Sequence, residues 1–404
     1  MTAPLALEGG SPIRTSPFPS WPIYGQEEAD AIVDVLHSGA WGSTSGQVVA
    51  TFEEAFASFA SAPYCTCVCN GTVALDVALR AAGVGPGDEV LVPTYTFIAT
   101  VSAVLFVGAV PVFVDIDAAT HLIDPTSVAA RIGERTKALI AVHIAGRPCD
   151  MDALLAVTAR AGIALIEDAA QAHGATWRGD GVGTFGVAGT FSFQSSKNVT
   201  AGEGGAVVST DPTVADRIYG LANVGRIRGG EWYDHRSVGY NLRLTEFQAA
   251  ILLRQLARQP DQAARREASA ARLTSELANV ADVMLPPEDD RITVHARHLF
   301  LFRIPRLARD RLRDRFVTAL RAEGIPSATG YVGHHENEAV LAMARKNARL
   351  AGYDYVPATC PVADVVARDT VWLPQYVLLA EPDEMADVAQ SVVKVLDRAD
   401  ALPQ

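Results

Sequence analysis

The chain has 404 residues, which is enough for two domains and a large buried core. Its 49% hydrophobic and 20% charged residues are typical of a globular protein, and its formal net charge of −12 argues against nucleic acid as a partner. No apolar run approaches the roughly 20 residues of a membrane-spanning helix, and no secretory signal opens the chain, so we expect a cytoplasmic location without membrane contact.

The first 24 residues predict an extended N-terminal arm, because they contain five prolines and two adjacent glycines. Helical patterns follow over about residues 25–38 and 48–61. The run Tyr64-Cys65-Thr66-Cys67-Val68-Cys69 then places three cysteines on one face of a strand. Zinc sites usually combine Cys-x-x-Cys turns with distant ligands. We therefore interpret these thiols as small buried hydrophobes, and we predict no metal site.

A regular alternation of strands and helices begins at residue 64. Continuous apolar runs predict strands at 64–69, 89–92, 110–114, 138–143 and 163–167. Such runs are expected of parallel strands that are covered on both faces. Segments with helical spacing, such as 72–82 and 151–161, separate the strands. We therefore predict a large α/β domain with a mostly parallel sheet over residues 25–255.

Further elements follow Gly205, first within this domain and then beyond it. A strand at 206–209 leads into a helix from Pro212, and the capping box Thr245-Glu246-Phe247-Gln248 opens another helix. A long charged stretch near 255–278 predicts a connecting helix. Further elements are expected as a strand at 299–304 and helices near 308–322 and 383–397. We interpret residues 256–404 as a smaller α+β domain.

Two residues indicate the chemistry. Asp168 ends the buried run 163–167, at a strand end of the kind where ligands of open α/β sheets collect. Lys197 follows 29 positions later, just before the glycine-rich turn 202–205. The pair suits pyridoxal phosphate. Lys197 would hold this cofactor as a Schiff base, and the carboxylate of Asp168 would keep the pyridine nitrogen protonated.

Neighbouring residues suit the same cofactor. Gly71 and Thr72 stand where a strand ends and a helix begins, and the free N–H groups of a helix N-terminus bind phosphate, although an ordinary helix cap has the same pattern. Ser192 would add a phosphate hydrogen bond, and Gln171 would reach the phenolic oxygen of the ring. Either Tyr95 or Phe97 would stack on the cofactor, while filling the core is an equal alternative for each ring taken singly. 

The histidines suggest no second centre. We expect His173 to be packed in the core rather than to act as an acid or base. His295 and His298 would lie on opposite faces of a strand, which argues against joint metal binding. His334 and His335 lie in a polar loop, where contact with a substrate is one interpretation and plain solvation is the commoner one.

Five segments in this order resemble the DegT/StrS-type (DnrJ/EryC-like) sugar aminotransferases. They are Asn-Gly-Thr-x-Ala-Leu (70–75), Pro-x-Tyr-Thr-Phe (93–97), Glu-Asp-Ala-Ala-Gln-Ala-His-Gly-Ala (167–175), Phe-Ser-Phe-Gln-x-Ser-Lys (191–197) and Gly-Glu-Gly-Gly (202–205). The resemblance implies a fold-type I pyridoxal phosphate enzyme, with a seven-stranded-type sheet in the large domain. It implies that Lys197 is the Schiff-base lysine, that Asp168 is the partner of the pyridinium, and that Phe97 is favoured over Tyr95 for stacking.

The same resemblance implies that Gly71, Thr72 and Ser192 bind the cofactor phosphate, and that Gln171 contacts the ring oxygen. The stretch Gly-Tyr-Asn-Leu-Arg-Leu (239–244) resembles the family segment whose asparagine reaches the phosphate in the partner subunit. Asn241 thus implies an obligatory homodimer with a composite active site.

The implied reaction is a ping-pong transamination from L-glutamine or L-glutamate to a keto-cyclitol or keto-sugar, in amino sugar or aminocyclitol (antibiotic) biosynthesis. The opening Gly-Gly-Ser-Pro-Ile-Arg and the run Ser-Ser-Lys-Asn-x-Thr-Ala-Gly-Glu-Gly-Gly resemble enzymes that act on scyllo-inosose-type ketones. Three alternatives stay open. They are a nucleotide-linked keto-sugar aminotransferase, a dehydrating enzyme like the 3-amino-5-hydroxybenzoate synthases, and a regulatory protein that retains the cofactor fold.

Overall fold

The computed structural model describes residues 4–309 and 311–402, and its centre is a seven-stranded sheet with the order β1-β9-β8-β5-β4-β2-β3. The strands are β1 (Tyr64–Val68), β2 (Glu89–Pro93), β3 (Val110–Val114), β4 (Thr136–Val142), β5 (Ala164–Asp168), β8 (Ala188–Ser192) and β9 (Gly205–Ser209). Neighbouring strands are parallel except at β9, which runs antiparallel to both β1 and β8. The predicted α/β class and mostly parallel sheet are confirmed.

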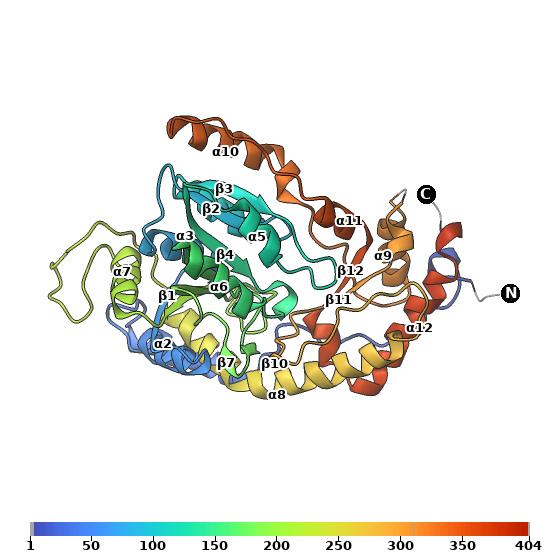
Figure 1. Ribbon diagram of the computed structural model, residues 1–404. Coiled ribbons are helices and arrows are strands. Elements are labelled where there is room, and N and C mark those ends of the chain that lie inside the picture. Colours follow the sequence, from blue (N-terminus) through green and yellow to red (C-terminus); the bar gives the residue numbers. More distant parts are fainter. Residues whose placement is uncertain (1–3, 310, 403–404) are drawn as a thin grey trace.

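Helices cover both faces of this sheet (Figure 1), and apolar side chains form a cluster on each face. Because side chains alternate along a strand, β9 directs Val207 into one apolar cluster and Ala206 and Val208 into the other. The first cluster includes residues of α3 (Gly71–Ala81), α4 (Ile98–Phe106), α5 (Pro125–Arg131), α6 (Met151–Ala161) and α7 (Pro212–Ala222). The second includes α2 (Val48–Phe59) and the buried thiols of Cys65 and Cys67, as expected, whereas Cys69 follows the end of β1 and is only partly buried.

A separate apolar core lies under a two-stranded antiparallel sheet of β11 (Leu299–Arg303) and β12 (Thr370–Pro374). The helices α9 (Leu312–Ala322) and α12 (Met385–Leu396) pack into it. Leu5 of the N-terminal arm is also buried there, so the arm is anchored to this smaller core.

One long helix, α8 (Glu246–Leu277), joins the two cores. It begins at the predicted capping box and continues through Pro260, so the two helices expected over this stretch are a single helix. Figure 1 shows it along the lower edge of the molecule, from beneath the large sheet to α12. α1 (Gln26–Ser38) packs against its first half. The predicted boundary at residue 256 therefore falls inside one helix.

Part of the C-terminal third returns to the large sheet. α10 (Glu338–Leu350) contacts α4 and β3, and α11 (Pro361–Asp369) adds apolar side chains to the same cluster. A small sheet of β6 (Thr176–Trp177), β7 (Asp180–Gly181) and β10 (Ile292–Val294) likewise joins distant segments. The division into domains at residues 25–255 and 256–404 remains a prediction. Within the described ranges, no helix has the length and apolarity needed to cross a membrane.

Candidate active site

A cavity of about 860 Å³ opens at the carboxyl ends of β5 and β8, between the two cores. Parallel strands of open α/β sheets present their ligand sites at this end. The cavity is lined by Trp21, Asn70, Gly71, Thr72, Val73, Leu75, Thr96, Phe97, Ala99, Val142, Asp168, Ala170, Gln171, Ser192, Gln194, Ser196, Lys197, Glu203, His298, Leu299, Tyr331, Trp372, Pro374, Gln375 and Tyr376. Asp168 and Lys197, predicted from the sequence as a pair, therefore share one cavity.

Asp168 is the last residue of β5 and is almost fully buried. Its Oδ2 accepts a hydrogen bond from Oγ1 of Thr100 at 2.8 Å, and its Oδ1 accepts one from the backbone N–H of Ala170 at 3.2 Å. Burial is the largest influence and raises the pKa of Asp168, and these two donors and the charge of Lys197 offset part of that rise. The donors therefore favour the ionised carboxylate that a protonated pyridine nitrogen requires.

Lys197 lies in the loop after β8, and its backbone N–H donates to the carbonyl of Gln194. Burial of its ammonium group lowers the pKa of Lys197 to about 8, and the nearby charge of Asp168 opposes that change. The neutral amine is the form that attacks a carbonyl or removes a proton. The cavity therefore makes this form available near neutral pH.

The start of α3 forms a cradle for an anion. Asn70 caps the helix, because its Oδ1 accepts the N–H of Val73 at 3.0 Å. A Cβ on Gly71 would lie 2.7 Å from Cβ of Ser192, so glycine is needed for β8 to approach the helix N-terminus this closely. Thr72 and Ser192 bring hydroxyl groups to the same place. Free N–H groups and hydroxyls are a donor set that fits a phosphate.

The two candidate stacking rings differ in position. Phe97 lines the cavity with 56% of its surface exposed. Tyr95 is fully buried between the rings of His121 and Tyr331 and is not among the lining residues. The segment after β2 directs Tyr95 into the core. Phe97 is therefore the ring of this pair that can contact a bound cofactor.

Gln171 lines the cavity in a fixed orientation. Its Oε1 accepts the backbone N–H of Ala145 at 2.7 Å, and its Nε2 donates to the hydroxyl of Tyr331 at 3.0 Å. Asn241, by contrast, is exposed and lies outside this cavity, paired through its backbone with Asn223. The lysine, the carboxylate, the phosphate cradle, one ring and the glutamine together fit pyridoxal phosphate, and Asn241 of the same chain does not join them.

Several lining residues were not predicted. Trp21 reaches the cavity from the arm, where its indole Nε1 donates to the carbonyl of Ser195 at 2.9 Å. His298, Tyr331 and Trp372 arrive from the C-terminal third. Their local sequences carry no periodic or capping signal, because long-range packing alone brings them to Lys197.

The remaining histidines are packed inside the protein. His173 is buried among Phe56, Phe191 and Phe193, as predicted. The interpretation of His334 and His335 as solvated loop residues is wrong, because both are buried and their rings bond to the loop after β2.

His335 lies beside a carboxylate, that of Asp364. Its Nε2 lies 3.3 Å from Asp364, while its Nδ1 bonds to Oγ1 of Thr94 at 2.8 Å. Glu336 lies close by, with the three ligand atoms within 4.8 Å of one another. The bonds to Thr94 and Asp364 account for both ring nitrogens without a metal ion.

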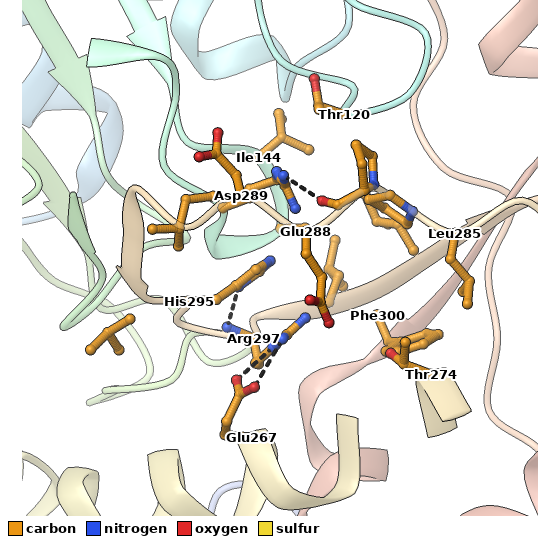
Figure 2. Close-up of a pocket in the computed structure, with 18 of the residues that line it drawn as sticks. Thr120, Ile144, Glu267, Thr274, Leu285, Glu288, Asp289, His295, Arg297 and Phe300 are labelled. Carbon is orange, nitrogen blue, oxygen red and sulfur yellow. Dashed lines mark hydrogen bonds and ion pairs between the residues drawn. The ribbon is translucent and has the colours of Figure 1, made fainter. Parts of the chain in front are cut away.

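Figure 2 shows a second cavity, of about 1040 Å³. It adjoins the first, because Leu299 lines both. Figure 2 shows Arg297 between His295 and Glu267, and its Nε donates to the Glu267 carboxylate at 2.8 Å. Arg291 likewise pairs with Asp289 at 2.8 Å. No lysine is among its described lining residues, so this cavity lacks the lysine–carboxylate pair of the first.

Comparison with known proteins agrees with this geometry. Residues 22–393 match the model of the DegT/DnrJ/EryC1/StrS aminotransferase family. The chain is 38% identical to a 3-amino-5-hydroxybenzoate synthase of Amycolatopsis mediterranei (strain S699), over 95% of this chain and 98% of that protein. It is 39% identical to an L-glutamine:2-deoxy-scyllo-inosose aminotransferase of Streptomyces fradiae, over 98% of both chains.

The solved structures give the same result. The crystal structure of 3-amino-5-hydroxybenzoic acid synthase superposes with a TM-score of 0.87 at 38% identity, over 95% of this chain and 100% of that chain. The chain therefore belongs to the DegT/DnrJ/EryC1/StrS aminotransferase family and is a pyridoxal phosphate-dependent aminotransferase.

Proposed function

We propose that this aminotransferase moves the amino group of L-glutamine to the ketone of an uncharged cyclitol. The observation that carries the proposal is the charge of the cavity. Among its described lining residues, Lys197 is the one lysine or arginine, and Asp168 and Glu203 are acidic. A nucleotide-linked keto-sugar brings a diphosphate, which proteins normally bind with arginine or lysine. A neutral polyol needs only hydrogen-bond donors and acceptors.

Bound pyridoxal phosphate would supply the electron sink for the carbanion at the substrate carbon. The protein groups would divide the remaining work. Lys197 would hold the cofactor and then, once freed, move the proton at the substrate carbon. Asp168 would keep the pyridine nitrogen protonated, Phe97 would cover one face of the ring, and Gly71, Thr72 and Ser192 would bind the phosphate.

We further propose that the active protein is a homodimer in which Asn241 serves the neighbouring subunit. Asn241 is exposed and outside its own cavity, in a loop that also exposes large apolar side chains. Tyr233 is 84% exposed and Val238 is 95% exposed. Exposed apolar side chains close together on a loop are a feature of protein interfaces. A cytoplasmic location is part of the same proposal, since the five cysteines are unpaired thiols.

One second candidate has specific support. A 3-amino-5-hydroxybenzoate synthase resembles this chain as closely, in identity and coverage, as the glutamine-dependent inosose aminotransferases do. Such an enzyme would dehydrate and aromatise a related keto-polyol in place of releasing an aminocyclitol.

The test is to load the protein with pyridoxal phosphate, add L-glutamine, and offer one acceptor at a time. A scyllo-inosose-type ketone should give an amine detected by mass spectrometry, with parallel initial-rate lines for donor and acceptor. Amination of a nucleotide-linked keto-sugar alone would refute the cyclitol proposal. An aromatic product with new ultraviolet absorbance would establish the second candidate instead.

A further inference from the structure

His295 and His298, which sit between β10 and β11, line different cavities. Figure 2 shows His295 in the second cavity, where its Nδ1 accepts the backbone N–H of Arg297 at 3.0 Å. His298 is buried and lines the cavity of Lys197. The two rings therefore line separate cavities. His298 belongs to the active-site cavity, and no role was assigned to it in the reaction described above.

The hydrogen bonds of Asn198 fix the proton on the ring of His298. The side-chain amide nitrogen of Asn198 lies 2.7 Å from the carbonyl oxygen of Ala296, which can only accept. The amide oxygen Oδ1 of Asn198 therefore faces Nδ1 of His298, at 3.1 Å. Because Oδ1 also can only accept, Nδ1 carries the hydrogen. Nε2 of the neutral ring is left with a lone pair.

No donor in the described part of the chain meets this lone pair, because the ring of His298 makes its hydrogen bond there through Nδ1, to Asn198. The ring also stays neutral. Burial lowers the pKa of His298 well below 6.5, and the charges of Lys197 and Arg266 lower it further. His298 therefore presents a constant hydrogen-bond acceptor to the cavity near neutral pH.

We propose that Nε2 of His298 is a subsite that accepts a hydrogen bond from an uncharged N–H or O–H group of a substrate. Two sources share this chemistry: the carboxamide of L-glutamine and a hydroxyl of a polyol ketone. A carboxylate such as that of L-glutamate offers only lone pairs and is disfavoured at Nε2. The identity of these substrates rests on the proposed function. The tautomer of His298 does not, because it follows from the hydrogen bonds of Asn198 alone.

Two variants separate the subsite from the bond to Asn198. His298→Asn keeps a donor near the position of Nδ1 and removes the acceptor at Nε2. His298→Gln places an amide oxygen near the position of Nε2 and loses the donor to Asn198. The matched control is His295→Asn, because His295 lines the other cavity.

Each half-reaction is followed separately by the absorbance of the bound cofactor in a single turnover. Loss of one uncharged hydrogen bond predicts about a tenfold fall in kcat/KM for His298→Asn in one half-reaction, with His298→Gln retaining most of the rate. A fall with L-glutamine that is absent with L-glutamate identifies the carboxamide as the donor group. A fall with a polyhydroxylated ketone that is absent with a ketone lacking hydroxyls identifies the acceptor. Equal losses in both His298 variants, or no loss in either half-reaction, would overturn the subsite.

Nitrogen NMR of cofactor-free protein with labelled histidine gives a readout independent of activity. One buried ring should show a protonated Nδ1 and an unprotonated Nε2, and its signals should vanish in His298→Asn and persist in His295→Asn. A protonated Nε2 on His298 overturns the inference. If the tautomer is as expected and L-glutamine reacts, but no cyclitol is aminated, then the proposed acceptor has failed rather than the subsite.

Discussion

Replacing Thr100 with valine should destabilise the ionised carboxylate of Asp168, which keeps the pyridine nitrogen of the cofactor protonated. The substitution keeps the shape of the side chain and removes the hydroxyl that donates to Oδ2 of Asp168 at 2.8 Å. Thr100 is 1% exposed, so water does not readily replace the lost donor. A hydrogen bond to a charged group contributes about 1.5–3 kcal/mol, which corresponds to about one to two pKa units for Asp168.

The direction follows from the ionised form. Asp168 has to be a carboxylate to keep the pyridine nitrogen protonated, and losing a donor raises its pKa. The acid limb of the pH profile for the half-reaction with L-glutamine should therefore move to higher pH by about one to two units. Below that limb the rate should fall by up to about 10- to 100-fold relative to the unchanged protein. Stopped-flow absorbance of the bound cofactor, recorded across a pH series, measures both effects.

Two controls accompany this variant. Thr100→Ser retains the hydroxyl and should retain the profile. Thr96→Val should shift the profile less, because Oγ1 of Thr96 bonds to Oγ1 of Thr100 at 3.0 Å, whereas the hydroxyl that donates to Asp168 is that of Thr100. If Thr100→Val shows the same profile and rate as the unchanged protein, the Thr100 hydrogen bond does not tune Asp168 and the reasoning is refuted.

Four further predictions follow from the structure. Gly71→Ala should raise the dissociation constant of pyridoxal phosphate at least about tenfold in a fluorescence titration, because its Cβ would lie 2.7 Å from that of Ser192; unchanged affinity would contradict the cradle. The rate at which cofactor-free protein binds pyridoxal phosphate covalently should rise as pH passes about 8, where Lys197 loses its proton; a rise only near the pKa of an ordinary lysine would contradict its burial. Asp369→Ala should lower the free energy of unfolding by about 3–5 kcal/mol in denaturant melts, since it strands buried Arg303, now paired at 2.7 Å; a loss below 1 kcal/mol would contradict the pairing. Hybrids of Lys197→Ala with Asn241→Asp should recover roughly a quarter of the activity, because half of the dimers are mixed and one of their two sites is intact; no recovery would place Asn241 in its own subunit's site.

Local patterns were sufficient for much of the fold. The apolar runs at β2, β3 and β5 gave strands within about a residue of their bounds, because strands covered on both faces have to be apolar throughout. Asp168 and Lys197 could also be predicted from the sequence. Asp168 ends β5 and Lys197 follows the end of β8, and these two strand ends meet at one edge of the sheet.

Other features depend on contacts between distant segments. The continuity of α8 across residue 255 was missed, because the stretch becomes strongly charged there and was taken as a separate helix, whereas packing against both cores keeps it one helix. The polar stretch at His334 and His335 reads as solvated, although its rings are buried against the residues that follow β2. His298 gave no sign of its place beside Lys197, because only the tertiary fold brings it to Asn198.

The most direct test of the central claim follows an isotopic label. L-Glutamine labelled at the α-amino nitrogen is supplied to the loaded enzyme with a scyllo-inosose-type ketone, and the product is weighed by mass spectrometry. We expect one labelled nitrogen in the aminocyclitol, and no transfer by Lys197→Ala. An unlabelled amine, or labelled transfer that survives in Lys197→Ala, would contradict amino-group transfer through Lys197.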